Sequence, residues 1–258
     1  KLKVEFLDVG QGDSTFIQTP QDYQVLIDGG PNSRVLEKLS SLMPVWDRTI
    51  DLVILTHPEK DHMQGLLNVL QVYKADYILW TGVKKSTSEY DKWINVLEKQ
   101  EEMGAKIIIA ESGQKIRVGN VLIEVFCPLK NIEGQELKSS VNNTSVVNKI
   151  TYGNNSFLFT GDISSAIEKG LVNSGEDILS DVLKVAHHGS KYSTSDLFLE
   201  NVNPKFAVIG VGKNSYGHPT SEVLQRLEKF GIKIFRTDED GDVEFVSDGI
   251  NLQLINNN

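Results

Sequence analysis

The sequence contains a single cysteine, Cys127, among its 258 residues. One cysteine excludes an internal disulfide framework and a zinc site built from several thiolates. Its strand-like surroundings, "IEVFCP", are typical of a small buried residue. The sequence also lacks any apolar run approaching the ~20 residues that a bilayer-spanning helix needs. We therefore expect no membrane contact by this chain itself.

Positive charge is scarce as well. Lys and Arg number 26 against 35 Asp and Glu, which gives a net charge of −9. This balance argues against a broadly basic face for nucleic acid, but a local basic track beside a metal ion would remain compatible with it. Lys84, Lys85, Lys191 and Lys213 are the candidates for such a track. A solvated surface is the simpler interpretation of the same four residues.

The chain begins with the strand-like segment "KLKVEFLDV", without an initiator methionine and without a secretory signal. We expect either a mature form or a domain excised from a longer protein. Its 40% hydrophobic and 24% charged residues are ordinary for a globular protein, and its length allows a large core. No internal repeat, low-complexity tract or linker interrupts it, so the sequence predicts one domain over residues 1–258.

Short apolar runs alternate with helix-period segments along the whole chain. The runs predict strands at residues 4–9, 14–18, 24–27, 52–56, 77–80, 106–110, 116–118, 121–126, 145–152, 156–160, 182–185, 206–209, 233–236 and 243–247. The helical periods predict helices at residues 33–41, 62–73, 88–102, 164–173, 195–201 and 220–230. Hairpin-like pairs followed by strand–helix units indicate a mixed α/β protein.

Histidine is rare, and "LTHPEKDHMQG", residues 55–65, holds two of the five. The segment follows an apolar strand and precedes a helix, so it lies where ligands collect in sheets flanked by helices. In such a loop His57, Asp61 and His62 can converge on one cavity. Imidazole and carboxylate are ligands of catalytic zinc, manganese or iron. Taken alone, the motif allows an alternative to a metal site. Asp61 could cap the start of a helix, and the two histidines could be incidental.

The remaining histidines and one aspartate occupy equivalent positions. Asp162 follows the apolar run of "NSFLFTGDIS", His187 and His188 follow that of "SDVLKVAHHGS", and His218 lies in the loop of "KFAVIGVGKNSYGHP". Histidines scattered at random would not all follow a strand. The sequence therefore predicts one shared, metal-centred site.

Two further kinds of segment bear on the chemistry. "HHGSKYSTS", residues 187–195, combines two imidazoles with Lys191 and the hydroxyls of Ser190 and Ser193, a mixture that suits an anionic phosphate and a leaving oxygen. The glycine-rich "DVGQGDS" and "LIDGG" lack the spacing of phosphate-binding loops that precede a helix. A tight turn between strands is the better interpretation of residues 10–14.

Taken together, seven motifs resemble the metallo-β-lactamase superfamily, and within it the hydrolase domain of the ComEC competence proteins, which act in DNA uptake. The motifs are "FLDVGQGDSTFIQ", "LIDGG", "LTHPEKDHMQG", "NNTSVV", "FLFTGD", "LKVAHHGSKYSTS" and "VGKNSYGHPTSEVLQRL", in family order. The resemblance implies an α/β (α+β) fold, the αββα sandwich of two packed mixed β-sheets flanked by helices. It implies a position outside the cytoplasmic membrane, as a domain of a membrane-bound uptake protein; a free-standing relative would be cytoplasmic.

The resemblance also implies metal ligands in the loop at residues 57–62. His57 matches the first histidine of the superfamily's His-x-His-x-Asp-His loop, and Glu59 stands where the second histidine usually is. Asp61 and His62 match the final pair. The first metal position therefore has an oxygen ligand where the family has an imidazole.

Later motifs complete the implied ligand set. Asp162 matches the aspartate that commonly bridges two metals, and His218 matches the late histidine of the second metal position. The third-motif histidine is absent, and Asn142 and Asn143 are the nearest polar candidates. Oxygen ligands favour harder ions such as manganese or magnesium. We expect one or two divalent ions, zinc or manganese, with the first position the weaker one.

The resemblance assigns roles beside the metals too. Related phosphodiesterases use a histidine in the motif that corresponds to "HHGS", residues 187–190. This implies His188 as general acid or transition-state stabiliser, with Ser190 beside it. His187 would be a ligand or an orienting group. Asp13 and Asp28 lie at the rim near the metals in such folds, where we expect them to act through hydrogen bonds to ligands.

The leading hypothesis is a metal-dependent hydrolase, a phosphodiesterase or nuclease that acts on DNA. A bound metal lowers the pKa of water toward ~7. Asp162 would hold that water and bridge any second ion, and Asp61 would be a further catalytic residue. The alternatives are hydrolysis of another ester or amide, such as a lactone, phosphocholine ester or β-lactam, and a non-catalytic, metal-stabilised domain of a DNA-uptake machine. DNA as partner rests on the resemblance, because the net charge of −9 does not favour it.

Overall fold

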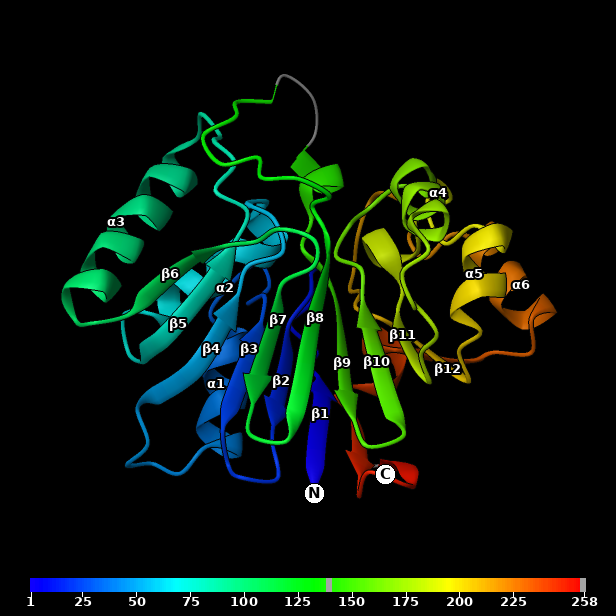
Figure 1. The fold of residues 1–258 in the computed structure, drawn as a ribbon, viewed down its shortest axis with the longest axis horizontal. Helices are drawn as coiled ribbons and strands as arrows, with labels where there is room; N and C mark the ends of the chain where they lie inside the picture. The colour runs from blue at the N-terminus through cyan, green and yellow to red at the C-terminus, as the bar shows by residue number, and fades with distance from the viewer. Residues whose placement is uncertain (138–140, 256–258) are drawn as a thin grey trace.

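The computed structural model describes residues 1–137 and 141–255. Two β-sheets pack face to face, and helices cover the outer face of each, which gives four layers (Figure 1). The expected αββα sandwich of two mixed sheets is therefore confirmed.

The first sheet has eight strands in the order β15-β14-β1-β2-β3-β4-β5-β6. Their bounds are β1 (Leu2–Phe6), β2 (Thr15–Gln18), β3 (Gln24–Ile27), β4 (Thr49–Ile54), β5 (Lys74–Trp80), β6 (Lys106–Ile109), β14 (Val243–Ser247) and β15 (Leu252–Ile255). Strands β3 to β6 pair in parallel, and the other pairs are antiparallel. Parallel strands are buried on both faces, which accounts for the unbroken apolar run of residues 52–55.

The second sheet has seven strands in the order β13-β12-β11-β10-β9-β8-β7. Their bounds are β7 (Lys115–Val118), β8 (Val121–Cys127), β9 (Val147–Tyr152), β10 (Asn155–Phe159), β11 (Val182–Lys184), β12 (Phe206–Ile209) and β13 (Lys233–Arg236). The first four of these strands in the chain pair antiparallel, whereas β10 to β13 are parallel.

Three helices pack on each outer face. Helices α1 (Arg34–Leu42), α2 (Lys60–Val69) and α3 (Ser88–Glu102) cover the first sheet, and α4 (Ser165–Ser174), α5 (Asp196–Val202) and α6 (Ser221–Lys229) cover the second. Shorter pieces are α7 (Thr237–Asp240) and the 3₁₀ turns η1 (Val141–Thr144) and η2 (Ala186–Gly189). Within the described residues, none of the helices combines the length and the apolar character needed to cross a bilayer.

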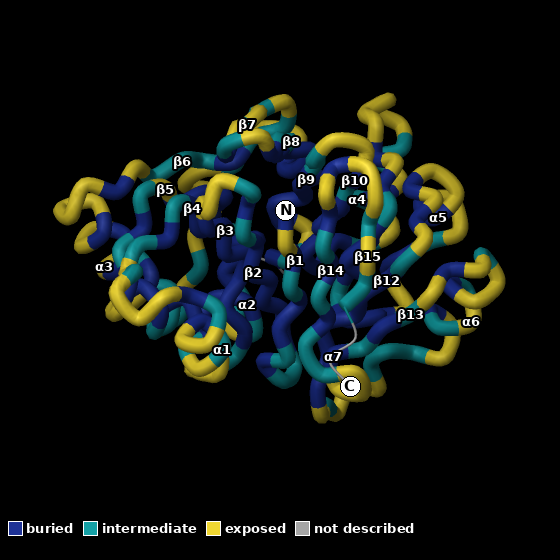
Figure 2. Tube along the Cα trace, turned by 90° about the horizontal axis from the view of Figure 1, so that it is seen from below, coloured by how far each residue is buried: buried dark blue, intermediate teal, exposed yellow. Residues whose placement is uncertain are grey.

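The main core lies between the two sheets. The ring of Phe6 in β1 stacks on that of Phe159 in β10, with centroids 5.8 Å apart, and meets the edge of Phe245 at 6.2 Å. Burying one such side chain contributes roughly 1.5–3 kcal/mol. Figure 2 shows the buried chain in the middle of the sandwich and the exposed chain on the outer helices and turns.

The predicted strands and the six longer helices are all present, with ends displaced by a few residues. Strand β15 and helix α7 were not expected. Both are four residues long, which is too short for a periodic apolar pattern to stand out.

The glycine that closes "LTHPEKDHMQG" explains how α2 reaches the site. A Cβ atom on Gly65 would lie 1.8 Å from the carbonyl oxygen of Gly29, in the loop after β3. Only glycine allows this approach, and the Gly65 N–H donates to the Gly30 carbonyl at 2.9 Å. The first turn of α2 is thereby fixed against the ends of β3 and β4.

Candidate metal centre

Loops from both sheets bring most of the predicted site residues to one end of the sandwich. The loops follow the carboxyl ends of β3, β4, β10, β11 and β12, and one more joins β1 to β2. Together with the first turn of α2, which holds Asp61 and His62, they carry, in chain order, Asp13, Asp28, His57, Asp61, His62, Asp162, His187, His188 and His218. Backbone hydrogen bonds join the loops, including Asp13 N–H to the Asp61 carbonyl at 3.2 Å.

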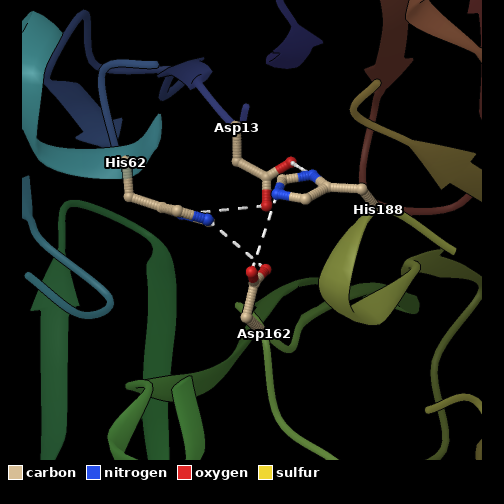
Figure 3. Close-up of side chains that lie close together, drawn as sticks. All are labelled: Asp13, His62, Asp162 and His188. Carbon is tan, nitrogen blue, oxygen red and sulfur yellow. Dashed lines mark ion pairs between the residues drawn. The ribbon is translucent and has the colours of Figure 1, made fainter. Parts of the chain in front are cut away.

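Asp162 stands at the centre of the cluster. The Nε2 atoms of four histidines surround its carboxylate: His62 at 3.4 Å, His188 at 3.6 Å, His187 at 3.8 Å and His57 at 3.9 Å. Figure 3 shows His62 and His188 approaching Asp162 from two sides. Asp162 is therefore the carboxylate on which imidazoles from both sheets converge.

The other ring nitrogen of His62 fixes the orientation of that ring. Its Nδ1 lies 2.8 Å from Asp28 Oδ2, so the Nδ1–H donates to the carboxylate and the Nε2 lone pair faces inward. Asp28 is held in turn by the backbone N–H and hydroxyl of Thr56, at 2.8 and 2.7 Å. Asp28 thus makes the hydrogen bond to a candidate ligand that was expected of it.

Hydrogen bonds at Nδ1 also fix the orientation of the His57 ring. Its Nδ1 lies 3.1 Å from the Thr56 hydroxyl and 3.2 Å from the Ser145 hydroxyl. Both hydroxyl hydrogens are donated elsewhere, to Asp28 and to the Asn142 carbonyl, so the oxygens accept the Nδ1–H of His57. Its Nε2 lone pair also faces Asp162.

The ring of His188, which follows a strand of the second sheet, is also anchored through its Nδ1 atom. Its Nδ1 lies 2.7 Å from the Gly210 carbonyl at the end of β12, and that carbonyl can only accept, so Nε2 is again the inward lone pair. This Nε2 is also 3.3 Å from Asp61 Oδ2. A neutral imidazole anchored through one nitrogen, with the other aimed at carboxylates, is the arrangement found at protein metal sites.

The inward atoms have no hydrogen-bond partner. Nε2 of His57, His62 and His188 and Oδ1 of Asp162 are all buried and unpaired within the described part of the chain. Buried polar atoms are almost always hydrogen-bonded, so such a set requires an explanation. Unpaired imidazole nitrogens and carboxylate oxygens facing one point fit a divalent cation.

The electrostatics of the cluster agree with this fit. Burial alone would lower the pKa of His188, but nearby carboxylates, Asp162 foremost, outweigh burial and raise it to about 10. The pKa of His62 is also raised against the effect of burial, again mainly by Asp162. For His57, burial prevails and lowers the pKa to about 3, assisted by His62. Without an ion, the raised pKa values of His62 and His188 favour a proton on each ring. A divalent cation would take the place of these protons and leave both rings neutral, with their Nε2 lone pairs as ligands.

Asp13 belongs to the same group, and its neighbours distinguish it from Asp162. Ligand atoms of Asp13, His62, Asp162 and His188 all lie within 4.8 Å of one another. Asp13, however, faces the Nδ1 atoms, 3.4 Å from that of His188 and 3.9 Å from that of His62. It also forms a buried ion pair with Lys184, the last residue of β11. Lys184 was missed in the sequence, although a lysine inside the apolar run "VLKVA" is unusual enough to signal a buried partner.

The backbone of Glu59 is hydrogen-bonded to those of His57 and His62, at 2.9 and 3.2 Å, but its carboxylate pairs with a lysine. Its Oε2 atom lies 2.5 Å from Lys85 Nζ, at the edge of the site. The residue that was expected to supply the first metal position is thus paired with a lysine. Asp61, two residues on, reaches His188 as described.

A cleft of about 220 Å³ opens from the cluster to solvent. It is lined by Gln11, Glu59, Asp61, Asn142, Asp162, His187, His188, Tyr216 and His218. The ring of His218 lies 5.5 Å from that of His187, and Asn142 Nδ2 lies 3.3 Å from His187 Nε2. Gln11 and Tyr216 were missed in the sequence. Tyr216 is two residues from His218, so its proximity to a predicted ligand was the available signal.

Two predicted residues lie apart from this cleft. Ser190 is 2% exposed, and its hydroxyl accepts a 3.4 Å hydrogen bond from the Tyr192 backbone, within its own turn. The side-chain oxygen of Asn143 accepts from the Ser164 N–H at 2.9 Å, just before α4. Neither is among the residues that line the cleft.

The backbone at the site is strained. Asp28, His187 and His188 adopt φ angles of 58°, 52° and 53°, in the left-handed region that costs non-glycine residues about 1–2 kcal/mol each. Such conformations persist where surrounding structure enforces them, and they concentrate at functional sites. Here they turn two consecutive histidines of "HHGS" toward Asp162.

Comparison with known proteins supports the same interpretation of the sequence. The profile described as "Metallo-beta-lactamase superfamily" matches residues 7–213. "ComE operon protein 3" of Bacillus subtilis (strain 168) is 33% identical over 94% of this chain, and "Competence protein ComA" of Neisseria gonorrhoeae is 28% identical over 92%. These matches cover 33% and 31% of the two relatives, so the chain spans about a third of their length. The resemblance to competence proteins is confirmed.

A solved structure shares the fold. The "novel metallo hydrolase" Igni18 from the archaeon Ignicoccus hospitalis KIN4/I superposes with a TM-score of 0.59. The alignment covers 95% of this chain and 99% of that one, at 15% sequence identity. At 15% sequence identity, the similarity concerns the fold alone.

Proposed function

The chain belongs to the metallo-beta-lactamase superfamily, and we propose that it is a metal-dependent hydrolase that cleaves phosphodiester bonds, with DNA as substrate. Metal dependence is supported by one observation above all. The Nε2 atoms of His57, His62 and His188 are buried and unpaired around Asp162. No proton donor within the described residues satisfies these atoms, whereas a divalent cation would.

The residues divide into two metal positions that share Asp162. Asp61, His62 and His188 would hold one ion with it, and His57 would hold the other, with His187 and Asn142 beside the cleft. Zinc or manganese bound there would polarise the phosphodiester and lower the pKa of water. The second position has two imidazoles and two carboxylates, and the first has fewer firm ligands, so we propose that the first is the weaker.

The geometry favours exchanging two of the roles that the resemblance implied. His188 is 2% exposed and anchored to Gly210, with Nε2 among the carboxylates, which suits a ligand rather than a general acid. His218 lines the cleft, and its Nδ1 has no hydrogen-bond partner in the described chain. Burial lowers the pKa of His218, so its neutral ring keeps one N–H to donate to a phosphate oxygen.

The choice of substrate rests on chemistry at the edge of the cleft and on the relatives. Lys85 stands beside Glu59 at the edge, and the Asn142 amide and His218 are donors suited to an anionic ester. Two relatives carry the names of competence proteins, which supports DNA over a lactone, phosphocholine ester or β-lactam. In a longer protein of that kind, we propose that this domain lies outside the cytoplasmic membrane.

Activity assays on chelator-treated protein test this function. The protein would be restored with Zn²⁺ or Mn²⁺ and incubated with single-stranded DNA, duplex DNA, RNA and a chromogenic β-lactam. We expect ion-dependent cleavage of DNA and none of the β-lactam. Cleavage of the β-lactam alone would establish a different hydrolase. Tight metal binding without turnover of any substrate would establish a metal-stabilised, non-catalytic domain.

A further inference from the structure

We propose that Tyr216 stacks on a nucleobase beside the scissile phosphate, so that the cleft accepts single-stranded nucleic acid. The inference rests on the proposed phosphodiesterase function and adds a residue that determines its specificity. Tyr216 occupies the loop between β12 and α6 and lines the same cleft as His187, His218 and Asp162.

The rings form a line from solvent to the centre of the site. The Tyr216 ring lies 5.9 Å from that of His218, tilted by 32°, and the His218 ring lies 5.5 Å from that of His187. His187 Nε2 is 3.8 Å from Asp162 Oδ2. A phosphate near Asp162 and His218 would therefore place its neighbouring nucleoside near the tyrosine.

The tyrosine is exposed but its backbone is well held. Asn214 Oδ1 accepts hydrogen bonds from the N–H groups of Tyr216 and His218, at 3.0 and 3.1 Å. Its Nδ2 donates to the carbonyls of Gly212 and His218, at 2.9 and 2.7 Å. The loop thus holds the backbone of a tyrosine that is 73% exposed, which reduces the backbone entropy lost when a ligand stacks on its ring.

A nucleobase is the occupant that the charges favour. The chain has a net charge of −9, so phosphate contacts alone would supply little affinity for a polyanion. Stacking of a base on an aromatic ring is worth about 1–3 kcal/mol and needs no positive charge. Bases inside a duplex are already stacked on their neighbours, so an exposed ring at the cleft selects unpaired strands.

The chain offers a matched control in Tyr192. That tyrosine is 67% exposed and follows His187 and His188 by a few residues, but it is not among the residues lining the cleft. Its ring lies beside Lys191 Nζ, 5.3 Å from the centroid. Removing Tyr192 therefore removes an exposed ring near the site without removing the proposed platform.

The test uses two oligonucleotides of equal length, one of normal single-stranded DNA and one with abasic sites throughout. Steady-state cleavage and equilibrium binding by fluorescence anisotropy are measured for the wild type, Tyr216→Ala, Tyr216→Phe and Tyr192→Ala. We expect Tyr216→Ala to raise KM and Kd for the normal strand about tenfold, with kcat nearly unchanged. Tyr216→Phe should restore most of the affinity that Tyr216→Ala loses, because its ring can still stack on a base. Tyr192→Ala should behave as the wild type. On the abasic strand, all four proteins should be alike.

Two results would overturn the inference. Tyr216→Ala could weaken both strands equally, which would show a contact with the backbone, or it could leave both unchanged. Failure of the wild type to cleave any strand with any ion would instead overturn the phosphodiesterase function. In that case binding of the two oligonucleotides still decides whether Tyr216 recognises a base.

Discussion

Lys184 forms an ion pair with Asp13 in the interior of the protein, behind the imidazoles of His62 and His188. The two side chains are 5% and 7% exposed. Asp13 thereby keeps a negative charge on the Nδ1 side of both rings, where it increases the basicity of the inward nitrogens. Lys184 offsets part of the excess negative charge that Asp13 brings to a site already rich in carboxylates.

Removing one partner of this pair is expected to destabilise the fold more than removing both. Lys184→Met or Asp13→Leu leaves an uncompensated buried charge, which costs about 3–5 kcal/mol of unfolding free energy. The double variant should recover most of that stability but bind its metal about 10–100-fold more weakly, because the anion behind the ligands is missing. Urea unfolding in chelator and metal titration would measure the two effects. Wild-type metal affinity in the double variant would show that the pair serves stability alone.

If His188 is a metal ligand and His218 a proton donor, their alanine variants should differ in metal content. His188→Ala should lose bound metal and activity together, because its Nε2 faces Asp61 and Asp162. His218→Ala should keep its metal content and lose turnover, by about 10²–10⁴-fold if it assists proton transfer. Elemental analysis of the purified variants, beside their kcat on DNA, separates the two. Loss of metal from His218→Ala with retention in His188→Ala would restore the roles that the family resemblance implied.

The sequence pattern predicted where His188 and His218 lie along the chain, but not how their rings are oriented. Apolar runs followed by His or Asp located the loops after β4, β10, β11 and β12, because the carboxyl ends of parallel strands lie at one edge of a sheet. Spacing could not show that left-handed backbone turns His188 inward, nor that Gly210 fixes its tautomer. Those facts depend on contacts between residues 22 positions apart. Lys184 escaped notice for the same reason, since its partner Asp13 lies in the other sheet's loop.

Glu5 makes the stability of the fold depend on pH, away from the site. It lies in β1 directly opposite Glu244, and burial, together with Asp242 and Glu244, raises its pKa from 4.5 to about 7. The folded state therefore binds this proton more tightly than the unfolded state, so stability falls as pH rises from about 4.5 to about 7. Glu5→Gln should stabilise the protein at pH 7.5 by about 1 kcal/mol after allowance for solvent screening, and by nothing at pH 4. Thermal unfolding across that range would reveal a constant difference if another group were responsible.

Glu59 and Lys85 decide how many ligands the first metal position has. Their 2.5 Å ion pair at the edge of the cleft leads us to expect that Glu59→Gln keeps the metal content of the wild type. Asp61→Asn is the matched control, because Asp61 contacts His188 Nε2 and its loss should release metal. Lys85→Met should leave the metal in place but raise the KM for DNA a few-fold, since it removes a cation from an exposed edge and leaves Glu59 to repel phosphate. That rise should shrink as salt increases. Loss of one ion per chain from Glu59→Gln would mean that Glu59 turns from Lys85 to the metal when the ion binds.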